Sequence, residues 1–321
     1  MSDPSWWQAA GATSTGVVVV ALLIAIILSS SFLLFRRKDD RKITKYPPYA
    51  PIGVWTILKA RMNKKSNAYW MLDIARELKS QVFQLSLPSF PIPKSIHIVG
   101  ESSTSRKILL HSSTTKPDVP YQSLRLVFGN TPSVFTLNVG PEWHAKRKAV
   151  APAFSYIHVK RMNRVALEKT EDWINKYNSS SGGGEGGGVV VDVAHEMIGI
   201  VLSSICETAF EYEMSTTEQE YFTHELELAL VEYARKAATI PLRLRFGQYF
   251  ISETRRAQLA VQNLIQMVYK IMSEYRARAT YIDGTIIQLI VQNHVAYPTN
   301  QEKAAELLTF LVAGHDTTGY R

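Results

Sequence analysis

One segment near the N-terminus limits the possible folds of this chain more than any other. It is residues 17–35 (VVVVALLIAIILSSSFLLF), which carry no charged side chain. As an α-helix this segment is about 28 Å long, which is enough to cross the hydrocarbon core of a bilayer. We therefore expect a transmembrane anchor at 17–35.

The charges beside the anchor predict its orientation. No Lys or Arg precedes it, whereas Arg36, Arg37 and Lys38 follow directly. The positive-inside rule then places residues 1–16 in a lumen or outside the cell and the rest of the chain in the cytoplasm. The alternative is a cleaved signal peptide, but such peptides have a basic N-terminal region and a shorter apolar segment.

The basic character of the chain comes largely from one cluster. The formal net charge is +8, and residues 36–45 contribute +4 of it through six Lys or Arg and two Asp. The remaining 311 residues share the other +4, which argues against a nucleic-acid partner.

Composition indicates a folded domain after the anchor. The chain has 321 residues, 46% of them hydrophobic, which is enough to form a sizeable core. Its single cysteine, Cys206, excludes an intramolecular disulfide framework and any multi-cysteine metal site. One cysteine also fits a domain that faces a reducing compartment.

The first part of the domain predicts a hinge and a small sheet. Residues 36–51 are basic and proline-rich, so we expect a short stiff connector there. Residues 66–79 have the pattern of an amphipathic helix. Val82–Leu87 and Ile96–Val99 alternate apolar and polar residues, which predicts a two-stranded hairpin.

The next segment predicts one helix and a long loop. Ser102 and Ser103 can cap a helix that ends near Leu110. Residues 112–140 hold many turn formers and no clear period, so we expect a loop, and a loop of this length is often functional.

The rest of the chain is helical in pattern. Pro141 opens a helix that Pro152 stops. A glycine- and serine-rich flexible linker occupies 179–188 within the domain 52–321. Further helices are predicted at 159–178, about 190–210, 218–239, 254–278, 283–295 and 301–321. The predicted fold class is therefore mainly α with a small β-sheet near the N-terminus.

The first motif with chemical meaning is on the helix opened by Pro141. Trp143 and Arg147 are four residues apart, so they share one face of that helix. An indole N–H and a guanidinium are pure hydrogen-bond donors, and together they suit one carboxylate. The alternative interpretation of this spacing is an exposed arginine that packs over a tryptophan of the core.

The second motif is Ala-Gly-His-Asp-Thr-Thr at 313–318, after an apolar helical stretch. Ala313 and Thr317 share one strip of the helix. Gly314 is unfavourable in a helix by about 1 kcal/mol relative to alanine, so it suggests close approach of another group. Asp316 offers a proton-exchanging group at the same place. The alternative is an ordinary helix end with Asp316 in solvent.

Together, these two motifs resemble those of the cytochrome P-450 family of haem-thiolate monooxygenases. The order of elements is also similar: membrane anchor, proline hinge, strand pair, long loop, Trp-x-x-x-Arg helix with Pro-Ala-Phe (152–154) behind it, and several helices before 313–318. The resemblance extends from residue 36 to residue 321.

The resemblance implies a site for haem b. Trp143 and Arg147 would bind a haem propionate, and the helix at 301–321 would cross the distal face of the haem. Residues from Phe128 to Leu137 would contribute to the pocket of an apolar small-molecule substrate.

The same resemblance implies how dioxygen would be handled. Ala313 and Gly314 would form the groove for dioxygen, Thr317 would hydrogen-bond the oxygen, and Asp316 would supply protons towards it. Electrons would come from NADPH through a reductase. The resemblance also places the protein in the endoplasmic reticulum membrane.

One departure from the family pattern concerns the iron ligand. Family members carry a Glu-x-x-Arg helix and a glycine-framed cysteine loop beyond the distal helix, and the sequence stops at Arg321. Cys206 precedes the distal helix in an apolar stretch, so we expect a buried, inert thiol and no metal ligand in this chain. We therefore expect a truncated chain that is inactive alone. The alternative function is a non-catalytic, membrane-tethered helical module derived from the same fold.

Three further groups of residues carry weaker signals. The histidines show no metal-binding spacing. Glu225 and Glu227 are expected at a solvated helix edge. A docking face for an acidic electron-donor protein is one interpretation of five basic residues, and a solvated surface is the other: Lys146, Lys148, Lys160, Arg161 and Arg164.

Overall fold

The computed structural model describes residues 47–50, 67–87, 94–111, 115–180, 190–237 and 249–319. The chain divides into two compact units, Met1–Thr114 and Thr115–Arg321, and each is considered by itself. The predicted anchor at 17–35 and the rest of the first 46 residues lie outside the described residues.

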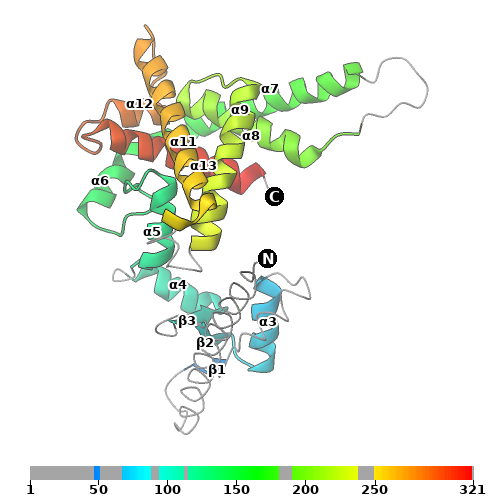
Figure 1. Ribbon diagram of the computed structural model, residues 1–321, viewed down its shortest axis with the longest axis vertical. Helices are drawn as coiled ribbons and strands as arrows, with labels where there is room; N and C mark the ends of the chain where they lie inside the picture. Colours follow the sequence, from blue (N-terminus) through cyan, green and yellow to red (C-terminus); the bar gives the residue numbers. More distant parts are fainter. Residues whose placement is uncertain are drawn as a thin grey trace, which may run out of the picture. The chain divides into compact units, whose positions relative to one another are not determined.

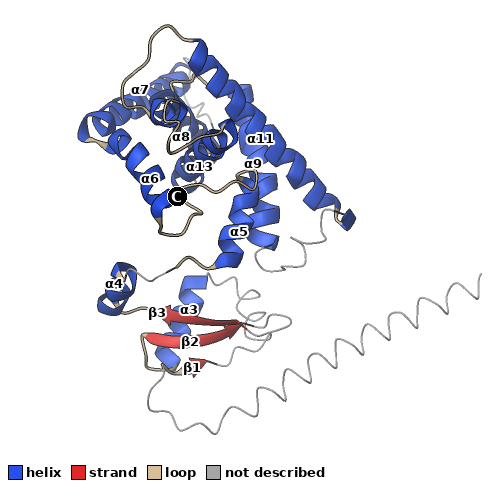
Figure 2. Ribbon diagram, turned by 90° about the vertical axis from the view of Figure 1, so that its left-hand side faces the viewer, coloured by secondary structure: helices blue, strands red, loops and turns tan. Residues whose placement is uncertain are grey.

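The first unit is built around a small sheet with strand order β1-β2-β3. Figure 2 shows its strands and the neighbouring helix α3. Its elements are β1 (Tyr49–Ala50), α3 (Asn67–Glu77), β2 (Val82–Leu87), β3 (Lys94–Val99) and α4 (Ser102–Leu110). The predicted hairpin is confirmed, since β2 and β3 are antiparallel with Val82 opposite Val99. Alternation along β2 buries Phe83 and Leu85 against Ile74 of α3.

Two details of this unit differ from expectation. The hinge contributes a strand, because Tyr49–Ala50 pairs in parallel with β2. The capping of α4 is also different: its N-cap is Glu101, whose carboxylate accepts hydrogen bonds from the hydroxyls of Ser103 and Thr104, both at 2.6 Å. The serine-type hydroxyls therefore act as donors to a preceding carboxylate, and this lowers the pKa of Glu101.

The second unit is helical (Figure 1). Its α-helices are α5 (Asp118–Val127), α6 (Pro141–Val150), α7 (Tyr156–Ser180), α8 (Val193–Phe210), α9 (Thr216–Ala229), α11 (Ser252–Ala277), α12 (Ile286–Val291) and α13 (Asn300–Gly319). A 3₁₀ turn, Ala151–Phe154, follows α6, and a π-helix, Leu230–Ala237, continues α9. Mainly helical structure with a small sheet confirms the predicted fold class.

Helix α13 lies in the centre of this unit. It contacts α8, α11 and α12, and it buries Leu307, Leu308 and Leu311 completely. Helix α8 is long and apolar enough to span a membrane by length and composition, but it packs against α13 and α7 as part of the helical unit. These contacts fix the distal helix predicted at 301–321 from several sides.

One sequence expectation for this unit was wrong. The segment 112–140 is not a continuous loop, because α5 occupies Asp118–Val127. The prolines that suggested a loop lie at its start: Pro117 is the N-cap, and Pro120 is in the first turn, where a missing N–H costs no helical hydrogen bond.

Candidate functional site: helices α6 and α13

Helix α6 carries the first motif. Gly140 is its N-cap and Pro141 its first residue, so the helix begins where the sequence predicted. Trp143 and Arg147 lie on one face, and the guanidinium carbon of Arg147 is 5.2 Å from the centre of the Trp143 ring. This stacking is a cation–π contact. Trp143 is partly buried and Arg147 is exposed.

The polar atoms of this pair fit a carboxylate ligand. Among the residues that the structure describes, no carboxylate pairs with the Arg147 guanidinium, and the indole N–H of Trp143 has no acceptor. The indole N–H and the guanidinium lie on one helix face, and the guanidinium can bind a carboxylate through two parallel hydrogen bonds. The residues present therefore fit the propionate of a haem.

Helix α13 carries the second motif. Ala313 is exposed, although Leu311, Val312 and His315 around it are buried. An uncovered small residue within a packed helix leaves room for a flat group against the backbone. Asp316 and Thr317 belong to α13, but their side chains lie outside the described part of the chain.

Gly314 has a different neighbour from the one the sequence suggested. An added Cβ would overlap Cδ1 of Ile205 on α8 and lie 3.3 Å from its Cγ1. The glycine therefore allows α8 to pack closely on α13. Ala313, rather than Gly314, is the residue that the described structure leaves uncovered.

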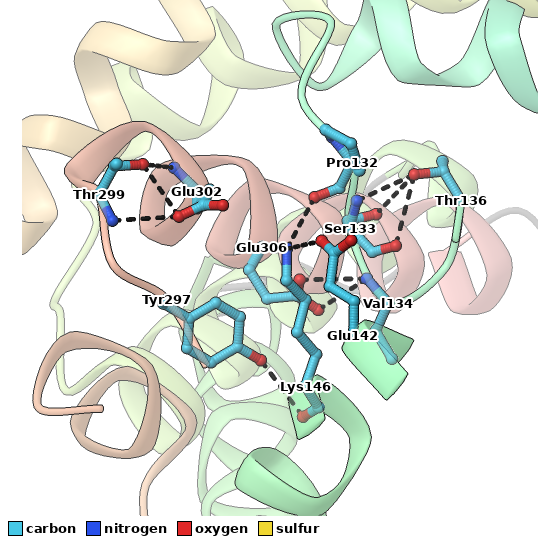
Figure 3. Close-up of polar contacts among 10 residues, drawn as sticks. All are labelled: Pro132, Ser133, Val134, Thr136, Glu142, Lys146, Tyr297, Thr299, Glu302 and Glu306. Atoms are coloured by element: carbon cyan, nitrogen blue, oxygen red, sulfur yellow. Dashed lines mark hydrogen bonds and ion pairs between the residues drawn. The ribbon is translucent and has the colours of Figure 1, made fainter. Parts of the chain in front are cut away.

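A buried carboxylate connects α13 to the segment before α6 (Figure 3). Glu306 is 0% exposed, and both its carboxylate oxygens accept from the backbone N–H of Val134, at 3.1 and 3.2 Å. A second hydrogen bond joins α13 to this segment: the side-chain amide of Gln301 donates to the Thr131 hydroxyl at 2.9 Å. The segment 131–136 is thus held on α13 from two positions of the helix.

Lys146 ties α6 to the same segment. Its side chain is 1% exposed, and its ammonium donates to the Pro132 carbonyl at 3.1 Å and pairs with Glu142 at 3.2 Å. The ammonium also lies 5.6 Å from the ring centre of Tyr297, whose hydroxyl donates to the Lys146 carbonyl at 3.3 Å. These contacts hold α6, and with it Trp143 and Arg147, on the segment 131–136 that Glu306 and Gln301 bind on α13.

Burial changes the pKa values of two groups in this cluster, Glu306 and Tyr297. Burial raises the pKa of Glu306 to about 7, while the Val134 N–H and the Lys146 ammonium act in the opposite direction. Burial also raises the pKa of the Tyr297 phenol, so it remains protonated. Glu306 therefore holds its proton up to near-neutral pH. It lies on the same face of α13 as Ala313, seven residues further along the helix.

Cys206 is placed as predicted. It is 0% exposed in α8, and burial raises the pKa of its thiol to about 12. A protonated, enclosed thiol has low reactivity.

Two groups of charged residues differ from expectation. Lys146 does not belong to a docking face, because it is buried, whereas Lys148, Lys160 and Arg164 are exposed and Arg161 is partly so. Glu225 is not at a solvated edge either: it is buried and accepts from the Asn263 side chain at 2.8 Å, while Glu227 is exposed.

Sequence reasoning did not single out Glu306 or Tyr297. A signal for Glu306 exists in the sequence, because it is a lone acid among Ala304, Ala305, Leu307 and Leu308. A charge inside such an apolar stretch is expected to have a buried partner.

The fold and this site define a mainly helical domain in which an arginine-bearing helix and a long central helix with an exposed alanine, Ala313, are both bonded to the segment 131–136. A model of one family, Cytochrome P450, matches residues 54–320, which is most of the chain. The chain therefore belongs to the cytochrome P450 family. A search of curated proteins finds no match. At the level of the family, this membership implies a haem-dependent oxidoreductase that uses redox partners and small-molecule substrates.

Proposed function

We propose that this protein is a membrane-anchored, haem-dependent monooxygenase that inserts one oxygen atom from O2 into an apolar organic substrate. The observation that carries the proposal is the paired face of Trp143 and Arg147, which have no carboxylate partner among the described residues, on a helix held on the segment 131–136 that α13 binds. The family match is independent support.

In this proposal Trp143 and Arg147 would hold a haem propionate, and the exposed Ala313 would leave room for the ring. Haem, when bound, supplies the activation of dioxygen. Gly314 lets α8 pack closely on α13 beside Ala313, and residues from Phe128 to Leu137 would contribute to the substrate pocket.

The chain's own contribution to the chemistry is proton delivery. Asp316 and Thr317 form an acid–hydroxyl pair one residue apart, and such a pair can pass protons inside a site that excludes water. Glu306 holds the segment before α6 in place on α13.

We further propose the location of the protein and its electron donor. Residues 17–35 anchor it in the endoplasmic reticulum membrane with the domain in the cytoplasm. An NADPH-dependent reductase supplies electrons and docks on the exposed cations Lys148, Lys160 and Arg164.

The proposed role of Asp316 and Thr317 in proton delivery is tested on the protein purified from the membranes of cells that make it. Hydrogen peroxide released per NADPH consumed is measured with a panel of apolar compounds. Thr317→Ala should raise this ratio, because protons no longer reach the oxygen in time. Thr318→Ala is the matched control and should leave it unchanged. If Thr317→Ala couples NADPH to product as well as the wild type, the relay assignment is wrong.

The second candidate is a non-catalytic helical module, and the observation that favours it is Cys206. The only cysteine of the chain is buried and protonated. We propose that residues 1–321 alone give no thiolate-type Soret band when mixed with haem, reduced and exposed to CO. Such a band would contradict both this statement and the non-catalytic alternative.

A further inference from the structure

A hollow of about 430 Å³ lies in the second unit, at the C-terminal end of α11, beside α12 and the start of α13. Figure 1 shows these three helices adjacent to one another. The lining residues used below are Tyr275, Arg276, Gln292, His294 and Asn300. The residues of the candidate functional site do not line this hollow, and neither the family match nor the proposed function gives it a role.

Two cations converge on this hollow. Arg276 lines it and donates from one guanidinium nitrogen to the Asn300 side chain at 2.8 Å. Lys303 lies directly behind the wall: it is 1% exposed, and its ammonium donates to the Val291 carbonyl at 2.7 Å and contacts Nδ1 of His294 at 3.2 Å.

These two charges are not neutralised within the part of the chain that the structure describes. No carboxylate there lies within 4 Å of the Lys303 ammonium or of the Arg276 guanidinium. The nearby acid Glu302 is engaged with the N–H and hydroxyl of Thr299. Burial and the Arg276 charge together lower the pKa of Lys303. A buried ammonium with a second cation beside it is unfavourable unless an anion compensates it.

Two further lining groups, Tyr275 and His294, have a hydrogen to donate. The Tyr275 hydroxyl accepts from the Gln292 amide at 3.3 Å, so its own proton is left to donate, and burial raises the pKa of this phenol to about 12. His294 accepts from Lys303 at Nδ1 when the lysine is charged, which assigns the ring proton to Nε2. The hollow is therefore lined by a guanidinium, a phenol and an imidazole N–H.

We propose that this hollow binds a phosphate group. Its tetrahedral oxyanion accepts from several directions at once, and a guanidinium binds it through two parallel hydrogen bonds. The exposed position of Arg276 lets it contact the ligand directly, while Lys303 neutralises charge from behind.

The test is a titration of the purified full chain with inorganic phosphate. Sodium chloride holds the ionic strength constant, and heat of binding and thermal midpoint are recorded. Phosphate should bind saturably and raise the midpoint. Arg276→Gln should weaken binding about tenfold, because a charge-assisted bidentate contact is lost. Arg256→Gln, an exposed arginine on the same helix, is the matched control and should bind like the wild type.

Arg276 is exposed, so its variant is expected to fold, and its thermal midpoint without phosphate verifies this. Glycerol phosphate distinguishes the two sources of the group: tighter binding than inorganic phosphate indicates an organic phosphomonoester, and equal binding indicates free phosphate. The proposal is overturned if the wild type shows no saturable binding, or if Arg276→Gln and Arg256→Gln lose affinity equally.

Discussion

Replacing Glu306 by glutamine should remove a pH dependence from the stability of this protein. The carboxyl group is fully buried and accepts two hydrogen bonds from the Val134 N–H. Lys146 is the nearby cation and Glu142 the nearby anion, and burial is the largest influence on its acidity. Glutamine retains a carbonyl that can accept from Val134 but cannot ionise.

The size of the expected change in stability follows from the shift in the pKa of Glu306. The pKa of Glu306 is about 7 in the folded chain, compared with an ordinary value of 4.5. The unfolded chain therefore loses this proton near pH 4.5, while the folded chain holds it to about pH 7. The contribution of Glu306 to the free energy of unfolding is fully present below pH 4.5. It falls by about 3 kcal/mol as the pH rises to 7. Above pH 7 the contribution no longer changes.

The assay is urea unfolding of the full chain and its Glu306→Gln variant at several pH values from 4.5 to 8. The difference between the two free energies of unfolding should move in favour of the variant by about 3 kcal/mol as the pH rises from 4.5 to 7.5. Glu168→Gln, an exposed carboxylate on α7, controls for the loss of one charge. The reasoning is refuted if wild type and Glu306→Gln keep a constant difference across this range.

Three further predictions concern packing and charge elsewhere. Gly314→Ala should destabilise the chain by about 1–3 kcal/mol because the new Cβ meets Ile205, and adding Ile205→Val should recover part of this loss in thermal unfolding; equal loss in the single and double variants would contradict it. The Cys206 thiol should resist maleimide in the native chain at pH 7.5 and react after denaturation, and rapid native labelling would refute its burial. The Glu218 carboxylate, bonded to Lys270 and Tyr212, has a pKa lowered to about 2. The cost of Glu218→Gln should therefore be complete above pH 4.5 and vanish as the pH falls towards 2, and a pH-independent cost would argue against it.

Local patterns predicted the elements that carry the site. Pro141 after Gly140 predicted the start of α6, and the spacing of Trp143 and Arg147 placed both on one face, as observed. The alternation in Val82–Leu87 predicted β2. These features depend on residues close in sequence, which is why periodicity and turn chemistry were sufficient.

Tertiary contacts account for what the sequence did not reveal. Lys146 and Glu225 were expected in solvent, but each is buried with a partner, and for Glu225 that partner is 38 residues away. Glu306 bonds Val134 across 172 residues. Helical periodicity shows which face a charge occupies, but not whether a distant backbone group is there to receive it.

The carboxylate contact of the proposed haem site can be measured directly. The purified full chain is titrated with haem b and with its dimethyl ester, which lacks both free carboxylates, and binding is followed by quenching of tryptophan fluorescence. The wild type should prefer haem b by about tenfold, and Arg147→Gln should lose this preference, because the bidentate partner of the propionate is gone. Lys148→Gln, an exposed neighbour on α6, should keep it. Equal binding of the two haems by the wild type, or an unchanged preference in Arg147→Gln, would contradict the assignment.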